Sequence, residues 1–168
     1  MIGPAPGIVN DQMLGTWHIV ATTLGFWRGR RDATATYAAL SGPRWSDTLR
    51  FRKGAREHVL VGTDTAHADA PGRFAWRGNG WLAWCTSTWT FAAVAPDGAW
   101  AITWFSAATL RVTPEGMDIY SRERSLPPHL LTELLAQTEQ LRPGLPEWRT
   151  IVQPGVDMAA YGLPTSLD

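Results

Sequence analysis

Hydrophobic and polar residues alternate with a period of two from Leu14 to Tyr120, a pattern typical of β-strands with one buried face. Turn-forming residues such as Pro96-Asp97-Gly98 and Pro114-Glu115-Gly116 interrupt the alternation. The segments between turns predict eight strands, at residues 14–24, 33–40, 46–52, 58–65, 72–78, 88–95, 100–105 and 117–124. Because most of these strands are joined directly to the next strand in the sequence, neighbouring strands should pair antiparallel. We therefore expect a mainly β fold, an eight-stranded antiparallel up-and-down barrel.

A different pattern begins after residue 125 and predicts one helix. Pro127 and Pro128 favour a helix start, and Pro143-Gly144 favours its end. Five leucines between them recur on one stripe at helical spacing: Leu130, Leu131, Leu134, Leu135 and Leu141. We expect a single domain over residues 1–168, with the barrel at about 14–124, the helix at about 127–142, a short final strand at about 149–153 and an irregular tail at 154–168. The leucine stripe needs an apolar partner, so the helix should pack on the outside of the barrel.

The composition narrows the class of protein. Fifteen Lys and Arg residues balance fifteen Asp and Glu residues, so no overall field attracts nucleic acid or an anionic membrane surface. No apolar run approaches the roughly 20 residues that cross a bilayer, and the first residues lack a signal-peptide pattern. The one cysteine, Cys85, suits a reducing compartment. We expect a cytoplasmic protein with no nucleic-acid partner and no membrane insertion; the sequence gives no oligomeric state.

Signatures of metal or cofactor chemistry are missing from the sequence. The four histidines lie far apart without ligand-type spacing, and Cys85 has no cysteine partner. No nucleophile-elbow, phosphate-loop or dinucleotide-binding motif is present. We therefore expect no metal and no cofactor.

Three separated motifs carry a resemblance to a known family. Gly15-Thr16-Trp17 opens the first strand, Ser121-Arg122 ends the last barrel strand, and the helix and residues 150–153 follow in order. In this arrangement the chain resembles the lipocalin superfamily, in the manner of retinol-binding and bacterial lipocalins with their calyx, over about residues 14–153. It departs from the family at the middle Thr-Asp-Tyr signature, near which Val94-Ala95-Pro96-Asp97 stands, and in lacking the disulfide of many secreted members. We therefore expect a distant, intracellular relative.

The resemblance implies roles for two residues at the closed end. In lipocalins the tryptophan of the first motif closes the barrel floor and the arginine packs over it; here these are Trp17 and Arg122. A guanidinium over an indole face gains cation–π attraction, so we expect this pair to be structural. Residues 26–31 should then lie at the open end, with Trp27 as an aromatic lid and the arginines of that loop as a gate for an anionic group.

Strand parity predicts which side chains face a cavity. If Trp17 points inward, Ile19 and Ala21 do too, and small wall residues leave room for one small ligand. The family register adds hydroxyl, aromatic and ionisable positions on the later strands, and Asp64 is a further candidate. The expected ligand-contacting residues are Trp27, Ala35, Tyr37, His58, Phe74, Trp76, Thr88, Thr90, Thr103, Phe105, Asp118 and Tyr120.

Two registers are open for residues 88–95. The family register turns Thr88 and Thr90 inward. Hydrophobicity alone instead turns Trp89 and Phe91 inward, and it would treat strand 100–105 in the same way by turning its tryptophans inward. We adopt the family register, because the helix needs an apolar outer wall to cover.

Two functions fit such a cavity. The first is binding of a small hydrophobic molecule, conjugated or polycyclic. The alternative is a cofactor-free cyclase or isomerase of a hydrophobic biosynthetic intermediate, with Asp118, Tyr120 or His58 as catalytic candidates. A carboxylate or imidazole in an apolar barrel would have a shifted pKa and could move protons. A purely structural or protein-binding barrel fits the small wall residues poorly.

Overall fold

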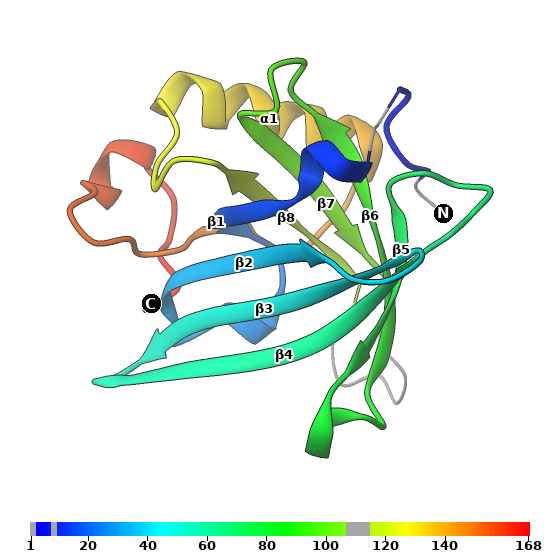
Figure 1. Ribbon diagram of the computed structural model, residues 1–168. Helices are drawn as coiled ribbons and strands as arrows, with labels where there is room; N and C mark the ends of the chain where they lie inside the picture. Colours follow the sequence, from blue (N-terminus) through cyan, green and yellow to red (C-terminus); the bar gives the residue numbers. More distant parts are fainter. Residues whose placement is uncertain (1–2, 8–9, 107–114) are drawn as a thin grey trace.

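Eight strands wind into a ring in the computed structural model, which describes residues 3–7, 10–106 and 115–168 (Figure 1). The strands are β1 Gly15–Thr22, β2 Arg31–Ala39, β3 Arg44–Lys53, β4 Arg56–Ala66, β5 Arg73–Gly78, β6 Thr86–Val94, β7 Trp100–Phe105 and β8 Gly116–Ser121. Strands adjacent in sequence pair antiparallel, and β1 closes the ring by pairing with both β2 and β8. The predicted eight-stranded antiparallel barrel is confirmed. The predicted turn at 114–116 lies partly outside the described residues.

One α-helix covers the barrel from outside, as predicted (Figure 1). Helix α1 (Pro128–Leu141) follows β8 and buries Leu131 and Leu134 against the wall. The short strand β9 (Arg149–Thr150) pairs with the end of β1 outside the ring. The final strand is therefore present but shorter than the predicted 149–153.

Two separate cores stabilise the fold. The inner core fills much of the barrel with rings from every side, and the outer core lies between α1 and the wall made by β1, β6, β7 and β8. The tryptophans divide accordingly. Trp17, Trp27, Trp45, Trp76 and Trp89 belong to the interior, Trp100, Trp104 and Trp148 pack around the helix, and Trp81 and Trp84 are exposed beside the β5–β6 turn. The outward orientation of Trp100 and Trp104 agrees with the family register for β7.

A β-bulge in β6 changes which side chains face the interior. Phe91 opposes Thr103 on β7, but Ala93 opposes Ile102, so Ala92 is an extra residue. Before the bulge alternate aromatic residues face inward; at the bulge two consecutive alanines join the outer core. The small alanines let the helix approach the wall.

The expectation that Thr88 and Thr90 face the cavity is wrong. Trp89 opposes the buried Phe74 of β5 and lies with Phe91 in the inner core, so the threonines on either side of Trp89 point to the outer face. Burial of the two large rings decides the register of this strand, because a slip of one residue would expose both of them.

A second bulge lies in β1. Ile19 opposes Tyr120 and Ala21 opposes Ile119, which leaves Val20 as the extra residue. Val20 and Ala21 both pack in the outer core, and Thr22 returns to the interior. The expectation that Ala21 faces the cavity is therefore wrong, because the extra residue of the bulge reverses the alternation of side chains after Ile19.

The C-terminal tail is more ordered than predicted. It contains a 3₁₀-helix, Met158–Tyr161, and a bridge between Thr150 and Thr165. The buried Ser166 accepts a hydrogen bond from the backbone N–H of Gly29 and donates its hydroxyl proton to the carbonyl of Arg30. The tail thereby holds the β1–β2 loop in place at the mouth of the barrel.

Candidate functional site

The closed end of the barrel is built around Trp17 and Arg122. The guanidinium carbon of Arg122 lies 3.5 Å from the centre of the Trp17 ring. Its nitrogens donate to three backbone carbonyls between residues 12 and 16, each at 2.9 Å. Gly15 has a φ of +95°, and a Cβ there would lie 3.3 Å from the Arg122 guanidinium. This is the pair that the resemblance implies, and its contacts seal the floor.

A cavity of about 160 Å³ lies inside the barrel. Its wall is mainly apolar, with three polar clusters described below. The lining residues are Leu24, Phe26, Trp27, Tyr37, Asp47, Leu49, Leu60, Trp76, Ser87, Trp89, Phe105, Ser106, Asp118 and Tyr120. Phe26, Leu49 and Leu60 are only partly buried, so the cavity reaches solvent on their side.

Three carboxyl groups are buried in the barrel, and each is held by one indole N–H. This pairing satisfies one oxygen of each acid and fixes the orientation of each indole. The pairs are Trp27 with Asp118 (3.1 Å), Trp89 with Asp64 (2.8 Å) and Trp76 with Asp47.

Asp118 is the carboxyl group whose hydrogen bonds are complete. Its Oδ1 accepts the hydroxyl of Thr22 at 2.6 Å, and its Oδ2 accepts the indole N–H of Trp27. Burial raises the pKa of Asp118 to about 7, and these two donors limit the rise. At neutral pH the group is therefore close to half protonated and is able both to give and to take a proton.

Asp47 and Asp64 form a second acidic cluster on the neighbouring strands β3 and β4. Asp47 opposes Gly62, and Asp64 stands two residues further along on the same face. Burial raises the pKa of Asp47 to about 7, and burial together with the Asp47 charge raises the pKa of Asp64 well above its ordinary value. Gly62 is required here, because a Cβ would overlap with the indole of Trp76.

Two tyrosines add hydroxyl groups to the wall. The hydroxyls of Tyr37 and Tyr120 lie 3.3 Å apart. Burial, and the neighbouring acids, raise the pKa of both well above the ordinary value for tyrosine. Both hydroxyls therefore keep their protons at neutral pH, and one of them donates to the other.

The β1–β2 loop closes one side of the mouth. Phe26, Trp27 and Phe51 meet edge to face, and the Arg30 guanidinium lies 4.1 Å from the centre of the Phe26 ring. Trp27 is buried as part of the inner wall and is not an exposed lid. Arg30 is engaged with this aromatic cluster and with the carbonyl of Phe26, and no lining residue of the cavity is an arginine among the described residues. Arg30 is therefore not free to act as the expected gate for an anionic group, and such a role for Arg28 and Arg31 stays a prediction.

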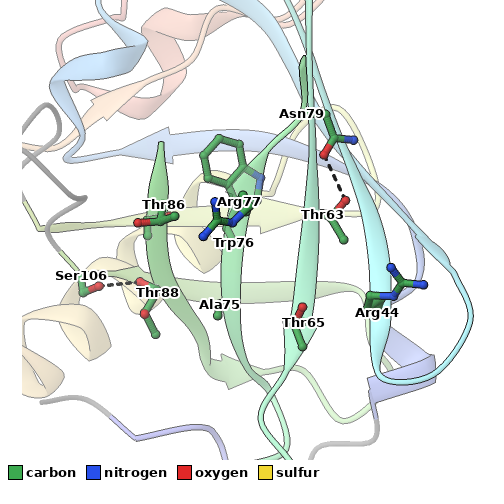
Figure 2. A pocket seen from close by; sticks show the side chains of 11 residues that line it. Arg44, Thr63, Thr65, Ala75, Trp76, Arg77, Asn79, Thr86, Thr88 and Ser106 are labelled. Atoms are coloured by element: carbon green, nitrogen blue, oxygen red, sulfur yellow. Dashed lines mark hydrogen bonds between the residues drawn. The ribbon is translucent and has the colours of Figure 1, made fainter. Parts of the chain in front are cut away.

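A larger hollow, of about 600 Å³, lies on the outer face of the sheet (Figure 2). It is lined by Arg44, Thr63, Thr65, Ala75, Trp76, Arg77, Asn79, Thr86, Ser87, Thr88 and Ser106. Thr63 and Asn79 bond to each other, and Arg44 and Arg77 bond to nearby backbone carbonyls. Its lining mixes polar and apolar groups, and we assign the ligand site to the inner cavity because the wall of that cavity is mostly apolar.

The described residues contain neither a cluster of metal-ligating side chains nor a membrane-spanning helix. Among them no three His, Cys, Asp or Glu side chains lie close enough together to hold a metal ion. None of the helices in the described part of the chain is long and apolar enough to cross a membrane.

Comparison with known proteins rests on structure. No protein-family model and no curated protein matches the sequence. Similar solved structures include apocrustacyanin C1, apocrustacyanin C2 and lobster apocrustacyanin A1, each with a TM-score of 0.66 and 10% identity over 86% of this chain and 79% of the other. Crustacyanin is a lipocalin. The fold of this chain is lipocalin-like.

Most of the residues predicted to line the site do face the interior of this lipocalin-like barrel. Trp27, Tyr37, Trp76, Phe105, Asp118 and Tyr120 line the cavity, and Ala35, Phe74 and Thr103 face the interior beside it. His58 does not: it is exposed near the β3–β4 turn and stacks on Phe51 at 5.3 Å between ring centres. With the outward-facing Thr88 and Thr90, it is excluded from the cavity.

The most informative residue that the sequence analysis missed is Asp47. It belongs to the alternation Trp45, Asp47, Leu49, Phe51 along β3. The three apolar members of this series place the carboxyl on the inner face, so the signal was present. Trp89, Leu49 and Leu60 were also missed, the first through the register chosen for β6.

Proposed function

We propose that the lipocalin-like barrel binds a small, largely hydrophobic molecule through one flat ring. The observation that carries the proposal is unfilled space within a core of aromatic rings. Protein interiors are close-packed, and cavities of this size are few. The indole of Trp89 stacks with Tyr37 at 5.3 Å and with Phe74 at 4.8 Å between ring centres, so flat surfaces already line the space.

The volume supports one ring and not a polycyclic ligand. An apolar cavity of about 150 Å³ accommodates a benzene molecule, and this one is about 160 Å³. A longer ligand would extend past Leu49 and Leu60 toward solvent. We therefore propose a single ring with a short substituent in place of the conjugated or polycyclic ligand expected from the sequence.

A matched pair of substitutions on β4 tests the site. Leu60 lines the cavity, whereas the neighbouring Val61 is 39% exposed on the outer face. Leu60→Trp should fill the mouth and abolish binding of a neutral probe such as 2-phenylethanol, measured by calorimetry. Val61→Trp adds the same ring to the outside and should bind the probe as the wild type does. Equal binding by both variants would show that the probe binds outside this cavity.

Proton-transfer catalysis is the second candidate function, and Asp118 is the observation that favours it. Its carboxyl lines the cavity and has a pKa of about 7, the value that suits a general acid or base at neutral pH. The hydroxyls of Tyr37 and Tyr120 would polarise a substrate oxygen. A cofactor-free isomerase or cyclase of a small ring compound is the form of this proposal.

A generic substrate tests Asp118 as a base without knowledge of the natural one. In 1,2-benzisoxazole the carboxylate takes the proton from C3, the N–O bond breaks, and 2-cyanophenol forms. The wild type should accelerate this ring opening above the buffer rate, and Asp118→Asn should return the rate to that of buffer. A rate unaffected by the substitution would exclude Asp118 as the base.

A further inference from the structure

Two carboxyl oxygens inside the barrel are buried without a hydrogen-bond donor. They are Oδ1 of Asp47 and Oδ2 of Asp64. Asp47 is 6% exposed and Asp64 is 0% exposed, and the carboxyl of Asp47 is part of the cavity wall. Burial of an acceptor without a partner is unfavourable, so this pair has capacity for a donor that the described residues do not supply.

Within residues 3–7, 10–106 and 115–168, the surroundings of the pair supply no positive charge. The ionisable groups around it are Tyr37 of β2 and Tyr120 of β8, with Asp118 next to Tyr120. All of these are neutral or negative in every protonation state. No cation contributes to the shifted pKa values of Asp47 or Asp64, and no lysine, arginine or histidine lines the cavity among the described residues.

Aromatic rings flank the same position. Trp76 lies over Gly62, next to Asp47, and Trp89 bonds to the other oxygen of Asp64. Ring faces carry partial negative charge and attract organic cations, most strongly when water is excluded. A carboxyl pair with unused acceptors, enclosed by indoles, is therefore suited to a charged nitrogen attached to an apolar group.

We propose that the cavity binds an organic cation whose protonated amine nitrogen lies against the carboxyl groups of Asp47 and Asp64. The attached ring lies among Tyr37, Trp76 and Trp89. This inference rests on the binding function proposed above and names its ligand class, a small aryl-alkyl amine. Asp118 is not the partner, because both of its oxygens already accept hydrogen bonds.

The decisive comparison uses two probes with the same ring and nearly the same shape. 2-Phenylethylamine carries a positive charge and 2-phenylethanol carries none. Calorimetric titration of the intact protein at pH 8, above the raised pKa of Asp47, should give an amine affinity about 10- to 100-fold higher than the alcohol affinity. This is the range expected when a charge-assisted hydrogen bond replaces a neutral one.

Variants locate the preference. Asp47→Asn and Asp64→Asn should each bring the two probes to nearly equal affinity while keeping the alcohol affinity, which also reports that the cavity is intact. Asp69→Asn, at an exposed aspartate, should keep the full preference. Persistence of the preference in both inner variants would overturn the assignment to this pair.

The outcomes separate this inference from the proposed function. If the wild type binds the alcohol as tightly as the amine, the cation site is refuted and the single-ring binding function stands. That comparison needs no variant, so it holds even if an inner variant fails to fold. If neither probe binds, the binding function fails and the cation site fails with it.

Discussion

Asp118→Asn should reverse the order of stability between wild type and variant as the pH rises. Asparagine keeps the shape of aspartate but does not ionise. Burial raises the pKa of Asp118 from 3.8 to about 7, and each pKa unit corresponds to about 1.4 kcal/mol. Above pH 7 the folded wild type is therefore about 4 kcal/mol less stable than it would be with an ordinary carboxyl at this position.

The sign follows from which state holds the proton. Well below pH 3.8 the carboxyl is protonated in both the folded and unfolded states, so it adds no pH dependence there. Between pH 4 and pH 7 the unfolded chain releases the proton while the folded protein keeps it, and stability falls as the pH rises. Asparagine removes this slope. The amide of asparagine has one acceptor oxygen, so it keeps only one of the two hydrogen bonds from Thr22 and Trp27. The lost bond lowers the free energy of unfolding by about 1–3 kcal/mol at every pH.

Urea denaturation followed by tryptophan fluorescence at several pH values measures the effect. The variant should be about 1–3 kcal/mol less stable than the wild type near pH 4 and as stable or more stable at pH 8. The same change at the exposed Asp69 should alter stability by less than about 0.5 kcal/mol. A constant difference between wild type and Asp118→Asn from pH 4 to pH 8 would refute the shifted pKa.

Two further predictions concern packing and are measured by the same denaturation assay. Gly62→Ala should lower the free energy of unfolding by about 1–3 kcal/mol, because the methyl group displaces Trp76 from Asp47. Gly25→Ala, at a position with open space, should lower it by under about 1 kcal/mol. Equal losses would contradict the close approach of Trp76 to Gly62. Leu131→Ala should lower the free energy of unfolding by about 2–5 kcal/mol, because Leu131 is 2% exposed. Leu141→Ala should lower it clearly less, because Leu141 is 36% exposed. Similar losses would contradict the packing of α1 on the wall.

The elements of the fold were readable from the sequence because their signals are local. The period of two, the turns and the leucine stripe each lie within a few residues. The sequence did not predict which side chains of β1 and β6 face inward beyond the bulges. An extra residue such as Val20 or Ala92 has no distinctive composition, and only pairing with the neighbouring strand shows it.

The candidate site was predicted only where strand parity was simple. Tyr37 and Asp118 follow from alternation on bulge-free segments. The position of Trp27 depends on Asp118, which lies 91 residues away, and no local pattern encodes that contact. His58 is exposed because the β3–β4 ladder continues to its turn at Lys53 and Arg56, which carries this part of β4 to the rim.

A crystal structure of the protein grown with 2-phenylethanol would show whether the inner cavity binds a single ring. We expect the phenyl ring inside the barrel, in contact with Trp76 and Trp89, with the hydroxyl directed to the acidic wall. An unchanged inner cavity at a saturating probe concentration, or a probe bound only in the outer hollow of Figure 2, would contradict it.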